Sequence, residues 1–337
     1  MRTELVSFYR APGSAAALTL EGALTEGGEI VSGALVAPDG ARFPIADGMP
    51  DFTWPQALPE KERETISFYD GRVDAYDENL PLTFRTHGED EAEVREAMAD
   101  RLMLKPGSTV LEIGAGTGRD SEVIARRLGG TGRFFCQDLA RSMLERNRAR
   151  LAAQGRRAEF SVANASHLPF ADRSFDAVFQ FGGVGEFSDI AGFFREVVRV
   201  TKPGGRVVVG DESMPPWLRR TTFAKILTLT NPQFDAPIPL EHVPVEAREV
   251  NLRWIIGGTF YLLDFTVGEG EPAADIDFPI PGPRGGTHRS RYYGRLEGVT
   301  PETKALAMQA REKLGLSMHD WLEQLVRREA ERVLKGG

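Results

Sequence analysis

The most constraining feature of the chain is the stretch VLEIGAGTGRDS at residues 110–121, where an apolar strand runs into a glycine-rich turn and a helix begins at once. Glycines allow the backbone to turn tightly and to pass close to a ligand. Their spacing is G-x-G-x-G, because Arg119 stands where a dinucleotide-binding fingerprint requires a third glycine. The stretch therefore predicts a strand–turn–helix unit of an α/β cofactor-binding fold and disfavours an NAD-type oxidoreductase.

Strand-like and helix-like segments alternate beyond residue 109, as a parallel α/β sheet requires. A hairpin with Gly257 and Gly258 at its turn follows them. We therefore expect an α/β fold with a Rossmann-like doubly wound sheet. The expected strands are TVLEI, RFFCQ, AEFSV, DAVFQF and RVVVG, and the expected helices cover residues 120–128, 142–154 and 189–201.

The segments on either side differ in composition from this core. Residues 1–60 are rich in Gly, Pro and Ala with short alternating stretches, which predicts a small β module. Residues 61–268 begin with charged, helix-forming sequence and continue into the core domain. Residues 269–337 predict an extended linker and a helical module, which Gly315 divides into two short helices.

Three further motifs follow the glycine turn in order. Asp138 ends the second expected strand about twenty residues beyond the turn, where α/β cofactor folds place an acid on ribose hydroxyls. Its alternative role is to cap the helix that starts near Ala140. The other two motifs are VANASHLPFADRSFDAVFQF and FFREVVRVTKPGGRVVVGD.

In this order the four motifs resemble class I S-adenosylmethionine-dependent methyltransferases, in particular the methyltransferase type 11 branch that includes the ubiquinone and menaquinone C-methyltransferases. The resemblance covers about residues 69–267 and implies an enzyme of class EC 2.1.1.- with S-adenosyl-L-methionine as cofactor. Asn164 stands where the family usually has Asp, and its amide oxygen can still accept from the adenine amino group. Tyr76 is either a cofactor contact or an aromatic that packs its helix. The cofactor-binding residues that the resemblance implies are Tyr76, Glu112, Gly114, Ala115, Gly116, Thr117, Gly118, Asp138, Leu139, Met143, Asn164, Ala165, Gln180 and Phe181.

Three residues are candidate catalytic bases. Methyl transfer from a sulfonium is an in-line displacement, so the protein mainly positions, desolvates and sometimes deprotonates the acceptor. Glu186 follows the fourth expected strand, Asp211 follows the fifth, and His242 precedes the final hairpin. The alternatives are an exposed helix-start carboxylate for Glu186 and a surface histidine for His242. The sequence has no D/N-P-P-Y/F motif, which counts against the adenine- and glutamine-N-methylating branches.

Charge and cysteine content restrict the partners. The formal net charge is −8, which disfavours nucleic acid because phosphate binding needs clustered Lys and Arg. Cys136 is the single cysteine, and the N-terminal stretch ARFPIADGMPDF resembles a zinc-ribbon-like domain without its cysteines, so we expect no metal. No apolar run reaches membrane-spanning length, so we expect a cytoplasmic protein without a membrane partner.

The C-terminal stretch RSRYYGRLEGV and the sequence after it loosely resemble a ribbon-helix-helix unit, a β-strand and two helices that pair across a dimer. The two helices can therefore serve as a homodimer or docking element. The nearby basic cluster, His288, Arg289, Arg291 and Arg295, can contact DNA or an anionic group of the acceptor.

The leading hypothesis is methyl transfer to a small-molecule acceptor. The alternatives are an RNA or protein acceptor, or a non-catalytic, cofactor-binding, DNA-associated dimeric regulator.

Overall fold

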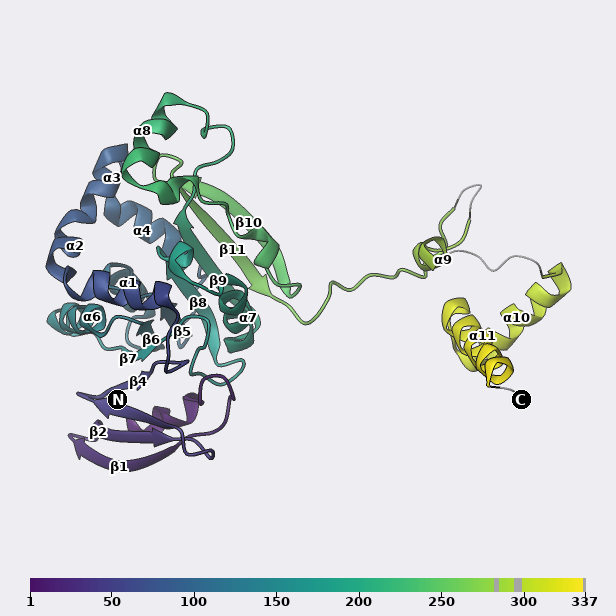
Figure 1. Cartoon of the computed structure of the whole chain (residues 1–337), viewed down its shortest axis with the longest axis horizontal. Coiled ribbons are helices and arrows are strands. Elements are labelled where there is room, and N and C mark those ends of the chain that lie inside the picture. The colour runs from purple at the N-terminus through teal and green to yellow at the C-terminus, as the bar shows by residue number, and fades with distance from the viewer. Residues whose placement is uncertain (282–284, 294–298, 336–337) are drawn as a thin grey trace. The chain divides into compact units, whose positions relative to one another are not determined.

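One sheet of eleven strands runs through the described residues in the computed structural model, in the order β1-β2-β3-β4-β7-β6-β5-β8-β9-β11-β10 (Figure 1). The structure describes residues 1–281, 285–293 and 299–335. They divide into two compact units, Met1–Glu271 and Pro272–Gly337, and the whole sheet lies in the first.

The central strands are parallel and confirm the doubly wound α/β fold. They are β5 (Thr109–Ile113), β6 (Arg133–Asp138), β7 (Glu159–Ala163), β8 (Phe175–Phe181) and β9 (Thr201–Glu212). The hairpin β10 (Ala247–Ile255) and β11 (Phe260–Val267) adds two antiparallel strands beside β9. The strand order reverses between β5 and β8, which is the switch point where open α/β sheets bind ligands.

Helices cover both faces of this sheet, which explains why every residue of β5 is buried. One face packs α4 (Glu91–Asp100), α5 (Arg119–Leu128) and α6 (Arg141–Ala153), and the other packs α7 (Ile190–Val200). Asp90 caps α4 by accepting from Ala92 N and Glu93 N, and Asp189 caps α7 by accepting from Gly192 N.

The N-terminal strands extend the same sheet. Strands β1 (Thr19–Glu26), β2 (Glu29–Val36), β3 (Arg42–Ala46) and β4 (Met49–Phe52) are antiparallel to one another and follow the 3₁₀ helix η1 (Thr3–Phe8). β4 then pairs in parallel with β7, with Phe52 opposite Ala163. Because the first unit includes both the expected β module and the expected methyltransferase domain, a domain boundary at residue 60 stays a prediction.

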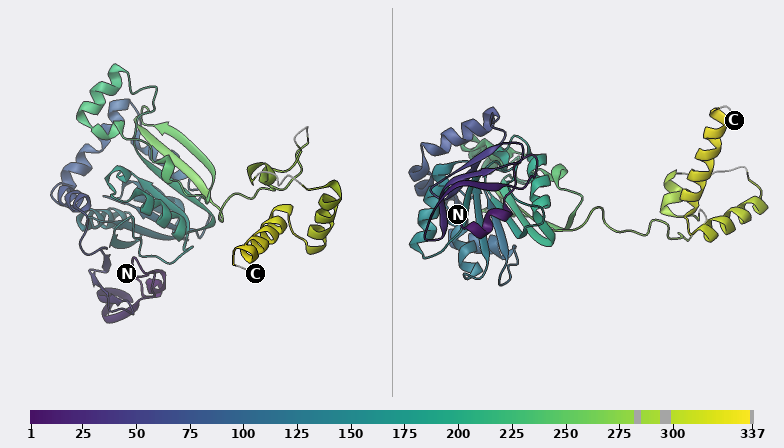
Figure 2. Two further views of the ribbon diagram at one scale, coloured as in Figure 1. Left: turned by 45° about the vertical axis from the view of Figure 1, so that its right-hand side comes forward. Right: turned by 90° about the horizontal axis from the view of Figure 1, so that it is seen from below.

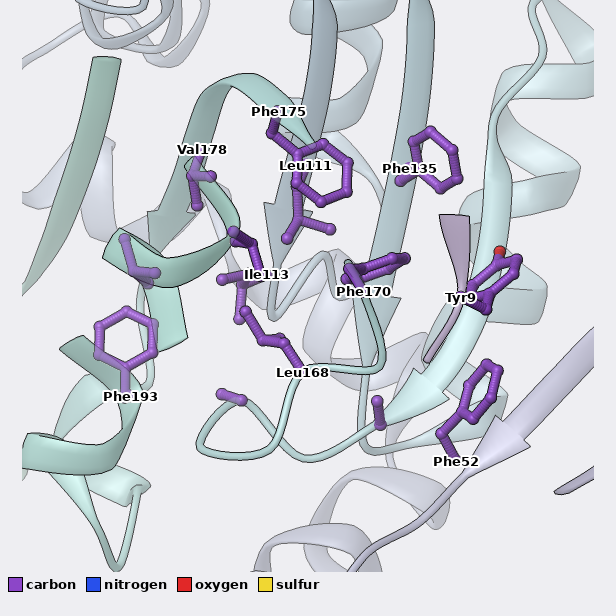
Figure 3. Packing of buried hydrophobic residues seen from close by; sticks show 14 of the residues in the cluster. Tyr9, Phe52, Leu111, Ile113, Phe135, Leu168, Phe170, Phe175, Val178 and Phe193 are labelled. Carbon is purple, nitrogen blue, oxygen red and sulfur yellow. The ribbon is translucent and has the colours of Figure 1, made fainter. Parts of the chain in front are cut away.

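An aromatic cluster joins the N-terminal strands to the central sheet (Figure 3). The ring of Tyr9 lies 5.2 Å from that of Phe52 and 5.4 Å from that of Phe170, and it meets Phe135 of β6 edge-on. All four side chains are buried. This contact makes the N-terminal strands part of the main core.

Short helices between β4 and β5 and after β9 cover the carboxyl ends of the parallel strands. They are α1 (Glu60–Asp70), α2 (Val73–Asn79), α3 (Pro81–His87), α8 (Thr222–Thr230), η3 (Pro232–Asp235) and η4 (Leu240–His242). Figures 1 and 2 show α1–α3 as one blue segment that runs from α6 to α8. A further 3₁₀ turn, η2 (Val184–Glu186), follows β8.

The second unit contains α9 (His288–Tyr293), α10 (Pro301–Leu314) and α11 (Met318–Leu334). Gly315 ends α10 in the left-handed conformation, as its place in the sequence predicts. The expected ribbon strand is wrong at its start, because residues 288–293 form a helix and residues 294–298, with Arg295, lie outside the described residues. Dimer formation through α10 and α11 stays a prediction. Over the described residues, no helix is both long and apolar enough to cross a membrane.

Replacing Phe52 tests whether the N-terminal strands share the main core. We expect Phe52→Ala to lower the free energy of unfolding of the first unit by about 3–5 kcal/mol, because the neighbouring buried rings cannot fill the lost volume. Guanidinium denaturation should show one shifted transition. Leu24→Ala on exposed β1 should change little. A separate early transition would contradict a shared core.

Candidate active site

The glycine turn after β5 has the conformation that its sequence predicts. Gly114, Gly116 and Gly118 have φ angles of 63°, 49° and 89°, which other residues rarely adopt. A Cβ atom at Gly118 would also collide with the side chain of Asn147 on α6. The turn therefore needs glycine for its backbone conformation and, at Gly118, for the close approach of α6.

Asp138, at the end of β6, holds this turn in place. Its Oδ2 accepts a hydrogen bond from Gly116 N at 2.9 Å, and its Oδ1 accepts one from Ala140 N at 2.9 Å. Burial raises the pKa of this carboxyl, and the backbone N–H groups oppose the rise. The expected cap of α6 is absent, because its N-cap residue is Ala140 and the Asp138 bond reaches only Ala140 N, ahead of the helix. The ribose contact stays a prediction.

Glu112 lies beneath the turn. Its carboxyl accepts from Ser121 Oγ at 2.5 Å and contacts Cys136 Sγ at 3.8 Å. Asn147 Nδ2 donates to Ser121 Oγ at 2.7 Å and to Ala115 O at 3.3 Å. Burial raises the pKa of Glu112 well above its usual range. These contacts make Glu112 a support of the turn, and its proposed contact with the cofactor is untested.

Helix α2 lies over the outer side of the turn. Asp77 Oδ1 accepts from Thr117 Oγ1 at 3.0 Å and from Arg119 Nε at 2.9 Å, and its Oδ2 pairs with Arg150 at 2.5 Å. Arg150 Nε also donates to Thr117 O at 2.8 Å. No sequence motif indicated Asp77, although it stands next to the candidate Tyr76.

Two tyrosines connect this helical cover to the strand ends. Tyr69 and Tyr76 pack edge to face at 5.5 Å, and Tyr69 Oη donates to Glu186 Oε1 at 3.3 Å. Burial raises the pKa of both phenols, with the charge of Asp138 as a smaller cause, so both stay protonated at neutral pH. The structure therefore adds Tyr69, seven residues before Tyr76, to the candidate site.

Four predicted cofactor-binding residues follow β6 and β7, namely Leu139, Met143, Asn164 and Ala165. Met143 and Ala165 are buried, Leu139 is half-buried, and all three follow strand ends closely. Asn164 is buried, and its Oδ1 accepts from Ser166 N at 3.0 Å. One acceptor position of the Asn164 amide is therefore used locally.

Gln180 and Phe181 end β8. Gln180 Nε2 donates to Gly182 O at 2.5 Å, and its buried Oε1 has no hydrogen-bond partner within the part of the chain that the structure describes. Phe181 packs against Phe260 of β11 at 5.6 Å. Gln180 thus has a spare acceptor at the switch point.

Three carboxyl groups meet at the ends of β8 and β9. Asp211 accepts from Gly183 N at 3.0 Å and from Gly185 N at 2.6 Å, which holds the loop after β8. Burial and the neighbouring Asp211 raise the pKa of Glu212 to about 9. Burial, followed by the charge of Asp211, also raises the pKa of Glu186. Glu186 is half-buried, so the exposed helix-start alternative does not describe it.

His242 does not join this group. It lies in η4 beside α7, and its Nε2 is 3.9 Å from its neighbour Glu241. Among the described residues, no hydrogen bond or ion pair links His242 with Glu186 or Asp211. The described residues also contain no cluster of three or more His, Cys, Asp or Glu side chains that could hold a metal ion.

A class I methyltransferase domain is defined by three features of this fold. Strands β5 to β9 are parallel, the hairpin β10–β11 is antiparallel, and the G-x-G-x-G turn lies at the switch point. Residues 110–205 match the family model described as a methyltransferase domain. Residues 110–205 therefore form a methyltransferase domain with distant homology to the ubiquinone and menaquinone methyltransferases. S-adenosyl-L-methionine is the methyl donor typical of the family.

Known proteins match parts of the chain. Demethylmenaquinone methyltransferase of Corynebacterium efficiens is 36% identical over 47% of this chain and 64% of its own length. The ubiquinone/menaquinone biosynthesis C-methyltransferase of Hahella chejuensis is 37% identical over 34% of this chain and 47% of its own length. The chain thus spans less than two thirds of these relatives. The structure of Haemonchus contortus phosphoethanolamine N-methyltransferase 2 is 14% identical, with a TM-score of 0.49, over 65% of this chain and 62% of that one.

The raised pKa of Glu212 predicts a pH-dependent stability. A carboxyl with a pKa of about 9 in the folded state holds its proton more tightly than in the unfolded chain, where the value is near 4.5. Stability should therefore fall as pH rises from about 5 to 9. Glu212→Gln mimics the protonated form, so the stability of this variant should decrease less between about pH 5 and 9. Thermal denaturation at several pH values measures this decrease. Glu26→Gln on exposed β1 is the control, and a fall unchanged in Glu212→Gln would contradict the assignment.

Proposed function

We propose that this chain transfers a methyl group from S-adenosyl-L-methionine to a small-molecule acceptor. One observation carries the proposal: Asp138 binds the glycine turn through Gly116 N at the strand switch point. This places a carboxylate and a close-passing backbone side by side, which is the arrangement that a ribose-containing cofactor needs.

The residues present fit such a cofactor. A Cβ atom at Gly114 or Gly116 would meet no atom closer than 3.9 Å, so these glycines leave room on the turn. The carboxylate oxygens of Asp138 each keep acceptor capacity for ribose hydroxyls beyond their backbone bonds. Met143 and Ala165 offer apolar contacts for the adenine, and Tyr76 lies near the carboxyl groups of Asp138 and Glu212.

Glu186 is the proposed base. The sulfonium supplies an electrophilic methyl group, so the protein needs only to position and deprotonate the acceptor. Glu186 would accept the proton that an acceptor O–H or N–H loses as its new bond to the methyl carbon forms and the methyl–sulfur bond breaks. The charge of Asp211 makes Glu186 a stronger base, and the Tyr69 hydroxyl orients its carboxylate. Asp211 itself serves as a positioning residue, since both its oxygens hold backbone N–H groups.

Calorimetry tests the cofactor class and the role of Asp138. We expect binding of S-adenosylmethionine and S-adenosylhomocysteine but not of NADH. Asp138→Ala should weaken binding by about tenfold to a hundredfold, because hydrogen bonds to a charged group are lost. Asp172→Ala, at an exposed carboxylate, is the control. Thermal denaturation of each variant shows whether it is still folded, so that a loss of binding can be distinguished from unfolding of the glycine turn.

Either of two results would overturn this proposal. Unchanged affinity in folded Asp138→Ala would remove the ribose role. A preference for NADH would remove the cofactor class itself.

The pH profile of methyl transfer tests Glu186. The rate should rise with pH as Glu186 loses its proton, with the rise shifted above the usual glutamate range because its pKa is raised. Glu186→Gln should lower kcat by about 10²–10⁴-fold and leave affinity for S-adenosylhomocysteine unchanged. Exposed Glu241→Gln is the control.

The assay follows labelled methyl groups in a metabolite extract. Label in acid-precipitable material would indicate a macromolecular acceptor instead. Wild-type rates in Glu186→Gln would exclude Glu186 as the base.

A further inference from the structure

The segment between β9 and η3 exposes several large apolar side chains. Phe223, Ile226 and Leu229 follow one another at intervals of three along α8, and their exposed fractions are 40%, 61% and 86%. Trp217, just before the helix, is 68% exposed although its ring packs against Trp254 at 5.1 Å. We call Trp217, Phe223, Ile226 and Leu229 the α8 surface.

The orientation of α8 is fixed by its other face. Ala224 is buried in a cluster with Phe84 of α3 and Phe260 of β11. Thr221 caps the helix by accepting from Ala224 N at 3.1 Å. Because these contacts hold the opposite side of α8, its exposed apolar residues cannot turn into this core. Figure 1 shows α8 beyond α3 at one end of the first unit.

The charge of this segment is opposite to that of the chain as a whole. Residues 213–234 contain Arg219, Arg220 and Lys225 but no Asp or Glu, whereas the whole chain has a net charge of −8. Arg219 pairs with Asp235 at 3.7 Å, while Arg220 and Lys225 are exposed. The apolar α8 surface is therefore bordered by positive charge.

We propose that the α8 surface docks on an anionic lipid bilayer. A short helix with an apolar face, nearby basic residues and an adjacent tryptophan has the composition of segments that lie in the membrane interface. Each basic residue near an anionic surface adds to the attraction. This proposal departs from the sequence-based expectation of no membrane partner, which rested on the lack of an apolar run long enough to span a membrane.

Vesicle binding tests this proposal without any methyl acceptor. The whole chain is floated with phosphatidylcholine vesicles that contain about 30% phosphatidylglycerol, and with phosphatidylcholine vesicles alone. We expect binding to the anionic vesicles that weakens with salt, and a blue shift of tryptophan fluorescence that Trp217→Phe reduces. Ile226→Ser with Leu229→Ser should lower the bound fraction by about tenfold or more.

Matched controls keep the result specific. The control variant Leu24→Ser/Val245→Ser changes two exposed apolar side chains outside the α8 surface, with exposed fractions of 56% and 60%. This variant should bind the vesicles as the wild type does. Absence of wild-type binding, or equal binding by folded Ile226→Ser/Leu229→Ser, would overturn the proposal. Sedimentation that shows a dimer broken by the same double variant, without vesicle binding, would assign the surface to a second copy and also overturn it.

Discussion

The site depends on the carboxylate of Asp138, which binds Gly116 N and Ala140 N at once. This carboxylate links the turn after β5 to the residue just before α6. It therefore connects the carboxyl ends of the neighbouring strands β5 and β6. The close contact of Gly118 with Asn147 fixes the same turn from the other side. A glycine turn with three left-handed residues would otherwise have many conformations, so these contacts give it one shape before any ligand binds.

The helical cover adds a second constraint at the outer edge. Asp77 on α2 pairs with Arg119 of α5 and Arg150 of α6, and Lys61 of α1 donates to Gly185 O after β8 at 2.8 Å. The contacts of Asp77 are partly buried and that of Lys61 is exposed, and together they hold α1 and α2 against both halves of the sheet edge. The cover therefore places Tyr69 against Glu186 after β8 and holds Tyr76 against Tyr69, beside the predicted cofactor site.

Local sequence patterns predicted the central part of the fold. They could not predict contacts between residues far apart in the sequence. The alternation of apolar strands with helices indicated β5 to β9, and the adjacent Gly257 and Gly258 indicated the last hairpin. The parallel pairing of β4 with β7 joins residues more than a hundred positions apart, which no local pattern encodes. The ribbon strand was wrong because Thr287 and Ser290 exchange side-chain to backbone hydrogen bonds that start helix α9. Tyr69 entered the site only through its contact with Glu186, another long-range pairing.

The three carboxyl groups at the strand ends show how burial divides roles that a sequence cannot separate. Asp211 is held by two backbone N–H groups, and Glu212, with a pKa of about 9, keeps its proton at neutral pH. Glu186 alone combines partial exposure, a raised pKa and an orienting phenol. Neighbouring acids of the same chemistry therefore differ in which can accept a proton, and that difference follows from their hydrogen bonds and burial rather than from their positions in the chain.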